Sequence, residues 1–406
     1  MISAFFIFLF HIIYRVICMK KILSLIMTFV LLFSFSVLTF AQNNKNACPV
    51  DVKAKSAILM EVNSGSVLAE LNADKKLYPA SVTKIMTILL AVEAIDNKKI
   101  SLKDNVTCSE NAASKGGSQI WLEQGEVMTV DDLLKATVIG SANDAATLLG
   151  EYISGDEKSF VALMNTRAKE LGMNNTHFVN ATGLDDDTTE HLSTARDIGI
   201  MSCELLKHKL ITNYSTVWMS ELRNGKTELV NTNKLVRFFN GTTGLKTGTT
   251  DKAGCCVSAS CERDGLHLVA VVMGSDNSTD RFESAKSLLN WGFSNYTVVT
   301  PQVNCEDITD IKVINGEKEL ITPKLPEISS LLVKKGEQEN IKQFTEICKD
   351  LEAPVDLGQK VGTLKYLNGN TCIAEYDIIS PVAVARLSLS TSFKRIVSYL
   401  LTGKYE

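Results

Sequence analysis

Residues 244–274, with the sequence GLKTGTTDKAGCCVSASCERDGLHLVAVVMG, decide the fold of this chain. Runs rich in apolar and β-branched residues predict three consecutive strands here, at Gly244–Thr250, Gly254–Glu262 and Leu266–Gly274. The dipeptide Asp264-Gly265 joins the last two strands and is typical of a tight turn between antiparallel neighbours. The stretch therefore predicts part of an antiparallel sheet.

A second hairpin and a block of helices precede this stretch along the chain, and one helix follows it. Ser56–Glu61 and Ser66–Glu70 flank Asn63-Ser64-Gly65, which predicts two strands joined by a tight turn. Apolar residues at helical spacing and capping signals predict helices at Ala80–Ile95, from Thr129 to about Ile139, and at Asp144–Tyr152, Ser159–Leu171 and Asp280–Trp291. Two hairpin regions separated by helices indicate an α+β fold, in which helices flank an antiparallel sheet.

The length of 406 residues and the hydrophobic content of 45% indicate two globular domains with terminal segments rather than a single core. We place the first domain at residues 51–300 and a small all-β domain at residues 301–386, where short β-like segments alternate with prolines. Those segments are Ile311–Ile314, Ser330–Val333, Lys360–Lys365 and Thr371–Tyr376. The second domain contains no cluster of residues that we interpret as catalytic.

Both ends of the chain carry apolar segments. Residues 1–41 form a leader in which residues 19–41 have the layout of an export signal peptide, and an uncleaved membrane anchor is the alternative. Either interpretation predicts an exported protein, secreted or held at the outer face of the cell membrane. Residues 387–406 include an amphipathic helix, Leu389–Leu401, which either lies on a membrane surface or docks on its own domain.

The composition excludes several classes of protein. The formal net charge is −4, whereas a nucleic-acid-binding protein needs a basic surface, so no nucleic-acid partner is expected. The cysteines form no C-x-x-C pair and the histidines form no H-E-x-x-H motif, so we expect neither a metal nor another cofactor. Of the ten cysteines, Cys18 lies in the leader; the other nine are an odd number, and we interpret them as buried packing residues.

Three short motifs carry the chemistry. In Ser81-Val-Thr-Lys84 the hydroxyl and the amine lie three residues apart on a predicted helix, so they face the same way. A serine hydroxyl becomes a nucleophile when a base takes its proton, and a buried lysine with a lowered pKa can be that base. Ser141-Ala-Asn143 alone is typical of a helix N-cap, and Lys246-Thr-Gly248 alone is typical of an ordinary surface strand.

The order and spacing of the motifs change this interpretation. Sixty residues separate Ser81 from Ser141 and 105 separate Ser141 from Lys246, in the order S-x-x-K, S-x-N, K-T-G. This ordered set is the active-site signature of penicillin-recognising serine enzymes. The flanking residues, such as His191-Leu-Ser-Thr-Ala-Arg-Asp197, resemble the low-molecular-mass penicillin-binding proteins that act as serine D-alanyl-D-alanine carboxypeptidases. The resemblance covers about residues 51–300 and departs from the common pattern at Ala142 and Thr243.

The resemblance implies a β-lactamase/transpeptidase-like fold with a helical subdomain, and a role in cell-wall biogenesis and cell shape. Ser81 would attack the carbonyl between the terminal D-alanines of a peptidoglycan stem pentapeptide, Lys84 would take its proton, and Ser141 would protonate the departing D-alanine. The implied substrate-binding residues are Asn143, Lys246, Thr247, Gly248 and Thr249, with the amides of Ser81 and Thr249 as oxyanion hole. Water would release the shortened peptide, and β-lactam antibiotics would acylate the same serine.

Three alternatives stay open at this point. A β-lactamase needs a glutamate-activated water, and Glu170-Leu-Gly-Met-Asn174 has the matching spacing, although it coincides with the predicted end of a helix. A transpeptidase would use the same acyl-enzyme. A catalytically weak penicillin-binding sensor of the envelope would be expected to lack Ser81, Lys84 or Lys246, all of which are present.

Overall fold

The computed structural model describes residues 47–185, 188–306 and 308–402. The predicted leader, residues 1–41 with the signal peptide at 19–41, lies outside the described residues. No helix in the described ranges combines the length and the apolar character that a bilayer crossing requires.

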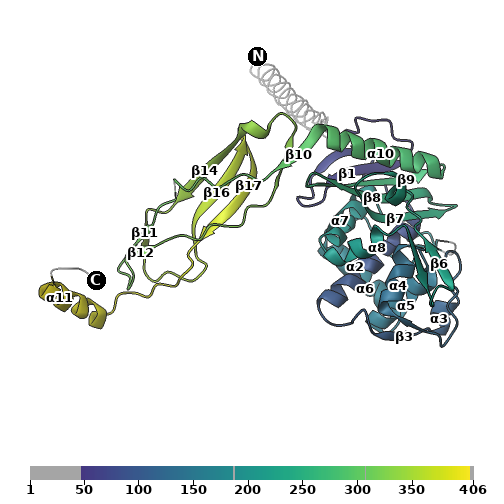
Figure 1. Ribbon diagram of the computed structural model, residues 1–406, viewed down its shortest axis with the longest axis horizontal. Coiled ribbons are helices and arrows are strands. Elements are labelled where there is room, and N and C mark those ends of the chain that lie inside the picture. The colour runs from purple at the N-terminus through teal and green to yellow at the C-terminus, as the bar shows by residue number, and fades with distance from the viewer. Residues whose placement is uncertain (1–46, 186–187, 307, 403–406) are drawn as a thin grey trace, which may run out of the picture. The chain divides into compact units, whose positions relative to one another are not determined.

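A five-stranded antiparallel sheet forms the centre of the first domain, with the strand order β2-β1-β9-β8-β7 (Figure 1). Its strands are β1 (Ser56–Glu61), β2 (Val67–Leu71), β7 (Thr242–Thr250), β8 (Gly254–Arg263) and β9 (Leu266–Ser275). These bounds confirm the two predicted hairpin regions to within two residues. Because β1 pairs with β9, the first hairpin joins the strands that the stretch at 244–274 forms much later in the chain.

Helices cover both faces of this sheet. They are the 3₁₀ helix η1 (Ala80–Thr83), α2 (Lys84–Asp96), α3 (Glu110–Ala113), α4 (Val130–Val138), α5 (Asn143–Ser154), α6 (Glu157–Glu170), α7 (Ala195–Leu206), η2 (Lys209–Ile211), α8 (Thr212–Ser215), α9 (Leu235–Phe238) and α10 (Ser278–Asn295). Two short ribbons, β3 (Asn105–Thr107) with β4 (Val127–Thr129) and β5 (Met219–Leu222) with β6 (Thr227–Val230), lie among them. The α+β prediction is confirmed, whereas α7 was not predicted.

The sheet separates two apolar cores, because alternate side chains of a strand point to opposite faces. Ile58 and Met60 of β1 belong to the core that the helical block from α2 to α7 fills. Ala57 and Leu59 belong to the core under α10, which Figure 1 shows on the other side of the sheet. The period of two in β1 therefore joins the helical block and α10 to the same scaffold.

Short strands make up the second domain, as predicted. They are β10 (Tyr296–Val299), β11 (Ile311–Ile314), β12 (Leu320–Ile321), β13 (Leu331–Lys334), β14 (Ile341–Ile347), β15 (Asp350–Glu352), β16 (Lys360–Asn368) and β17 (Thr371–Ile379), with the 3₁₀ helix η3 (Gln338–Asn340). β14, β16 and β17 form one antiparallel sheet, and β11 lies between β12 and β15 in another. Val361, Leu364 and Tyr366 belong to a core of this domain's own.

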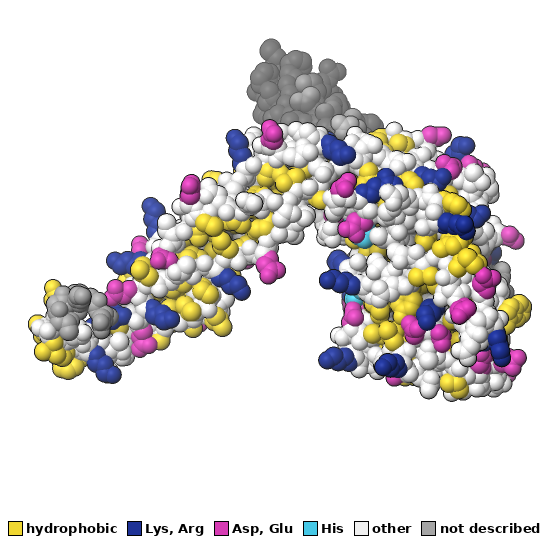
Figure 2. All heavy atoms as spheres, in the orientation of Figure 1, with side chains coloured by type: hydrophobic (Ala, Val, Ile, Leu, Met, Phe, Trp, Pro, Cys, Tyr) yellow, Lys and Arg dark blue, Asp and Glu magenta, His cyan; other side chains and the backbone are white. Residues whose placement is uncertain are grey.

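The last described helix, α11 (Leu389–Thr402), keeps its apolar face exposed (Figure 2). Leu389, Phe393 and Leu400 are 92%, 68% and 77% exposed, so the alternative in which this face docks on its own domain is wrong. Arg395 instead donates a hydrogen bond to the carbonyl of Glu317 and pairs with Glu319, which attaches the polar side of the helix to the loop between β11 and β12.

The described cysteines fall into two groups. None forms a disulfide, and five are buried: Cys108, Cys203, Cys255, Cys256 and Cys261. For these the interpretation as packing residues is confirmed, and burial raises the pKa of Cys256 to about 11. It is wrong for the second domain, where Cys305, Cys348 and Cys372 are exposed, because short strands around a small core leave much of their surface to solvent.

The core of the helical block rests on large buried side chains, of which Phe160 on α6 is fully buried. We expect Phe160→Ala to lower the free energy of unfolding by about 3–5 kcal/mol, since it removes apolar contacts and leaves a cavity. Denaturant unfolding of the purified protein measures this change. Leu163→Ala is the control on the same helix: Leu163 is 38% exposed, so its truncation is expected to cost less than about 1 kcal/mol, and equal losses would contradict the assignment of Phe160 to the core.

Candidate active site

Lys84 lies at the centre of a cluster of polar groups. It is the first residue of α2, directly after the single 3₁₀ turn η1 that contains Ser81, so the two side chains face the same way. Its Nζ lies 2.9 Å from Ser81 Oγ, 2.5 Å from Asn143 Oδ1 and 2.9 Å from the backbone carbonyl of Thr182. The contact that the S-x-x-K spacing predicts is therefore formed.

The surroundings of Lys84 favour its neutral form. The side chain is fully buried, and burial lowers its pKa well below the usual range of a lysine. The positive charge of Lys246 lowers this pKa further, while the carboxylate of Asp144 acts in the opposite direction. A buried amine with a lowered pKa can take a proton from the hydroxyl beside it.

The turn that carries Ser81 is held from behind. Ala80 has a φ of 49°, in the left-handed region, and its carbonyl is packed against Gly183, where a Cβ atom would lie 1.8 Å from that oxygen. Thr83 Oγ1 lies 2.8 Å from His191 Nε2. Because His191 Nδ1 accepts from the Val179 amide, the proton of the neutral ring is on Nε2 and points to Thr83.

His191 is a structural histidine, as predicted. It is fully buried, and burial, followed by the charges of His177 and Lys84, lowers its pKa to about 4. Its ring is therefore neutral near pH 7.

Asn143 and Ser141 lie at the start of α5. The N-cap of this helix is Ala142, and no side chain caps it, so the interpretation of this motif as an ordinary N-cap is wrong. The Asn143 side chain is instead used by the site, since Oδ1 accepts from Lys84 and Nδ2 donates to the Gly116 carbonyl over 2.6 Å. Ser141 is buried with a left-handed φ of 63°, but no described hydrogen bond joins its hydroxyl to Lys84 or Lys246.

Strand β7 brings the K-T-G motif against the serine turn. A Cβ atom at Gly248 would lie 2.8 Å from the Ser81 nitrogen, so only glycine allows this approach. Lys246 is buried, and burial, followed by the positive charge of Arg281, lowers its pKa to about 7. Its Nζ donates to the Thr247 carbonyl over 3.1 Å, and Thr247 Oγ1 donates to Thr232 Oγ1 over 2.7 Å.

Arg281 of α10 is part of this site, and the sequence analysis missed it. Its Nη1 donates to the Gly248 carbonyl over 3.0 Å, to Thr249 Oγ1 over 3.2 Å and to the Cys256 carbonyl over 3.1 Å. Burial lowers its pKa. A buried arginine among the apolar residues of the predicted helix Asp280–Trp291 was the available signal. The Thr182 carbonyl and the Thr232 hydroxyl carry no comparable signal in the sequence.

The glutamate that a β-lactamase would need lies elsewhere. Glu170 is the last residue of α6, as predicted, and its carboxylate pairs with Arg167. In the described ranges, one group of possible metal ligands lies together, Glu93, Glu204 and His208, and Arg167 binds both of its glutamates. Neither feature contacts Ser81 or Lys84.

Comparison with known proteins identifies the family. The model of the Peptidase S11 family, described as D-alanyl-D-alanine carboxypeptidase, matches residues 41–277, and that of the penicillin-binding protein 5 C-terminal domain matches residues 296–386. The chain belongs to the D-alanyl-D-alanine carboxypeptidase family. The predicted serine peptidase of this class, with its fold and its second all-β domain, is thereby confirmed.

Individual relatives agree with this membership. The chain is 39% identical over 382 residues to D-alanyl-D-alanine carboxypeptidase DacF of Bacillus subtilis, which covers 93% of this chain and 98% of that protein. It is 37% identical over 349 residues to DacC of Escherichia coli, covering 84% and 86%. The structure of penicillin-binding protein 5 from Haemophilus influenzae matches with a TM-score of 0.73 and 30% identity, covering 84% of this chain and all of that one.

Gly248 tests the geometry of the site. We expect Gly248→Ala to slow covalent labelling by a fluorescent penicillin about 100-fold, because the added Cβ meets the backbone nitrogens of Ser81 and Val82. Gly116→Ala is the control, since nothing lies within 4 Å of its Cβ position and its φ is not left-handed. Labelling of Gly248→Ala at the wild-type rate would mean that β7 does not approach the serine this closely.

Proposed function

We propose that this chain removes the terminal D-alanine from peptidoglycan stem pentapeptides through an ester on Ser81. The observation that carries the proposal is the buried Lys84 amine, 2.9 Å from Ser81 Oγ, with a pKa lowered by burial. Lys84 takes the serine proton as Ser81 Oγ bonds to the carbonyl carbon between the two D-alanines. The bond to the last D-alanine then breaks, and a proton goes to its departing amine.

The other predicted residues have supporting roles in this proposal. Ser141 carries the proton to the leaving D-alanine, and the amides of Ser81 and Thr249 donate to the oxyanion. Lys246, Thr247 and Thr249 bind the terminal carboxylate, to which a cation and two hydroxyls are complementary. Asn143 holds both Lys84 and the substrate amide. Water completes the reaction by hydrolysing the ester, which restores Ser81.

Release of D-alanine tests this function. We expect the purified full chain to release D-alanine from diacetyl-lysyl-D-alanyl-D-alanine and to be labelled by a fluorescent penicillin, and Ser81→Ala to abolish both. Labelling without release in the wild-type chain would favour an envelope sensor. Rapid turnover of the penicillin would favour a β-lactamase, and products joined to a second peptide would favour a transpeptidase.

We also propose that the protein is exported and that α11 lies on the surface of the cell membrane. Its exposed apolar face, with Leu389, Phe393, Ile396 and Leu400, supports this proposal, since such a face gains free energy by entering the lipid interface. The cationic side chains Lys394 and Arg395 come from the same helix and would face anionic headgroups. The substrate class, a component of the cell wall, is consistent with this location.

Vesicle binding tests the role of α11. We expect the full chain to co-sediment with vesicles that contain anionic phospholipid, and the pair Phe393→Asp and Leu400→Asp to weaken this binding about 10-fold or more, because two buried apolar side chains are lost from the interface. Phe344→Asp is the control, since Phe344 on β14 is 50% exposed but lies outside the helix. Equal binding by all variants would contradict the proposal and leave D-alanine release unaffected.

A further inference from the structure

The three groups around Lys84 Nζ differ in one respect that matters for a base. A neutral primary amine has two N–H donors and one lone pair, whereas an ammonium has three donors and no lone pair. Two of the neighbours, Asn143 Oδ1 and the Thr182 carbonyl, can only accept hydrogen bonds. The third, Ser81 Oγ, carries a proton that it can donate. Both acceptors together therefore use both donors of the neutral amine and direct its lone pair to Ser81.

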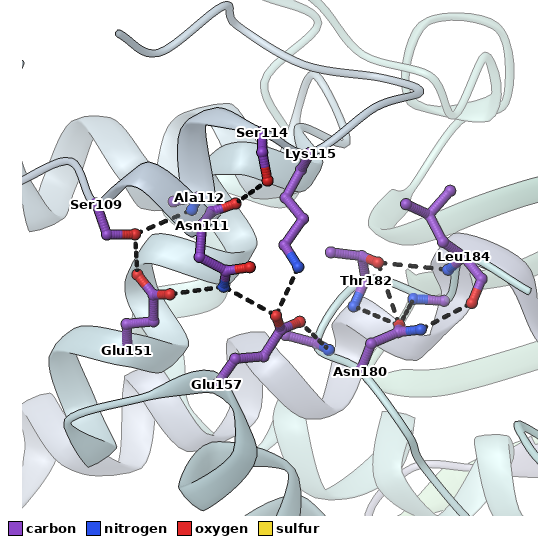
Figure 3. Close-up of polar contacts among 12 residues, drawn as sticks. Ser109, Asn111, Ala112, Ser114, Lys115, Glu151, Glu157, Asn180, Thr182 and Leu184 are labelled. Carbon is purple, nitrogen blue, oxygen red and sulfur yellow. Dashed lines mark hydrogen bonds and ion pairs between the residues drawn. The ribbon is translucent and has the colours of Figure 1, made fainter. Parts of the chain in front are cut away.

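The Thr182 carbonyl lies in an irregular segment between α6 and α7, so something other than a helix or a strand must fix it. The side chain of Asn180 does this (Figure 3). Its Oδ1 accepts from the Thr182 amide over 3.1 Å, from the Thr182 hydroxyl over 3.1 Å and from the Gly183 amide over 2.7 Å, while Nδ2 donates to the Leu184 carbonyl over 2.7 Å. One amide side chain thus closes the turn at residues 181–184.

The same turn contacts the nucleophile from a second direction. Gly183, whose amide Asn180 holds, packs against the carbonyl of Ala80, the residue before Ser81. A displacement of the turn would therefore move an acceptor of Lys84 and release a contact of the serine turn together.

A charged network anchors the turn to the rest of the helical block. Glu157 at the start of α6 accepts from the Ala181 amide over 3.5 Å and pairs with Lys115 over 2.6 Å (Figure 3). Lys115 is followed by Gly116, whose carbonyl accepts from the Asn143 side chain. The two acceptors of Lys84 are thus held by neighbouring parts of one network, and Asn180 is the member that bonds directly to Thr182.

We propose that Asn180 is a positioning residue for Lys84: by fixing the Thr182 carbonyl, it directs the lone pair of the amine to Ser81. This inference rests on the proposed function of Lys84 as the base. An asparagine suits the turn because its side chain both accepts and donates. Aspartate can accept from the same amides but cannot donate to Leu184, and alanine can do neither.

The charges around Lys84 set the direction of a pH test. Lys246 of β7 lies near enough to lower the pKa of Lys84, Asp144 of α5 acts in the opposite direction, and the neutral His191 lies behind Thr83. In Asn180→Asp a carboxylate is added on the side of Thr182. A nearby negative charge stabilises the ammonium and raises its pKa. Because acylation needs the neutral amine, its rate would then rise only at higher pH.

The rate of acylation by a fluorescent penicillin, measured on the full chain as a function of pH and of drug concentration, tests the proposal. We expect Asn180→Ala to lower the rate constant at saturating drug about 10- to 100-fold at every pH, with half-saturation changed less than about threefold. We expect Asn180→Asp to retain more of this rate constant than Asn180→Ala and to shift the acid limb to higher pH.

Asn165→Ala is the matched control. Asn165 on α6 bonds to the backbone of Phe178 in the same segment, through both Oδ1 and Nδ2, but it contacts no group of the site. Acylation by Asn180→Ala at the rate of Asn165→Ala, or an unshifted acid limb in Asn180→Asp, would overturn the proposal; the second result decides if Asn180→Ala does not fold. Failure of the proposed function is distinct, because then the wild-type chain would release no D-alanine or Ser81→Ala would still be labelled.

Discussion

The burial of the Lys84 amine is the constraint on which the rest of the site depends. Its three hydrogen-bond partners, a hydroxyl, a side-chain amide oxygen and a backbone carbonyl, are all uncharged. A positive charge in such surroundings is costly, so the fold favours the neutral amine. The same burial that would be a defect in a purely structural lysine therefore produces a base beside a serine. The start of α2, the start of α5 and the irregular segment before α7 meet at this one atom.

Backbone strain accompanies this arrangement. Ala80 and Ser141 both adopt a left-handed φ, although neither is a glycine, and each precedes a residue with a side chain on Lys84 or one position removed from it. Such conformations cost about 1 kcal/mol or more each and persist where the surroundings hold them. At Ala80 the surroundings are the packed Gly183 and the bond from His191 to Thr83. The stability lost in the backbone is offset by the large apolar core of the helical block.

The features that could be predicted from the sequence are those with local signals. The strands β1, β8 and β9 follow from alternation and turn residues, and the contact between Ser81 and Lys84 follows from helical geometry. Membership of the family followed from three motifs in order. Arg281, the Thr182 carbonyl and the Asn180 turn could not be derived in this way, because their partners lie far away in sequence and any polar residue is locally acceptable there. The expected link from Ser141 to the two lysines stays a prediction.

His191 limits the conditions under which the serine turn is stable. In the unfolded chain its imidazole binds a proton below a pKa near 6.5, whereas in the fold this pKa is about 4. The unfolded state therefore takes up more protons between these values, and stability is lost as the solution is acidified through this interval. Protonation of the folded ring would also replace the acceptor at Nδ1 with a second donor, facing the Val179 amide. An acid-tolerant homologue would need to replace this imidazole with a group that does not titrate.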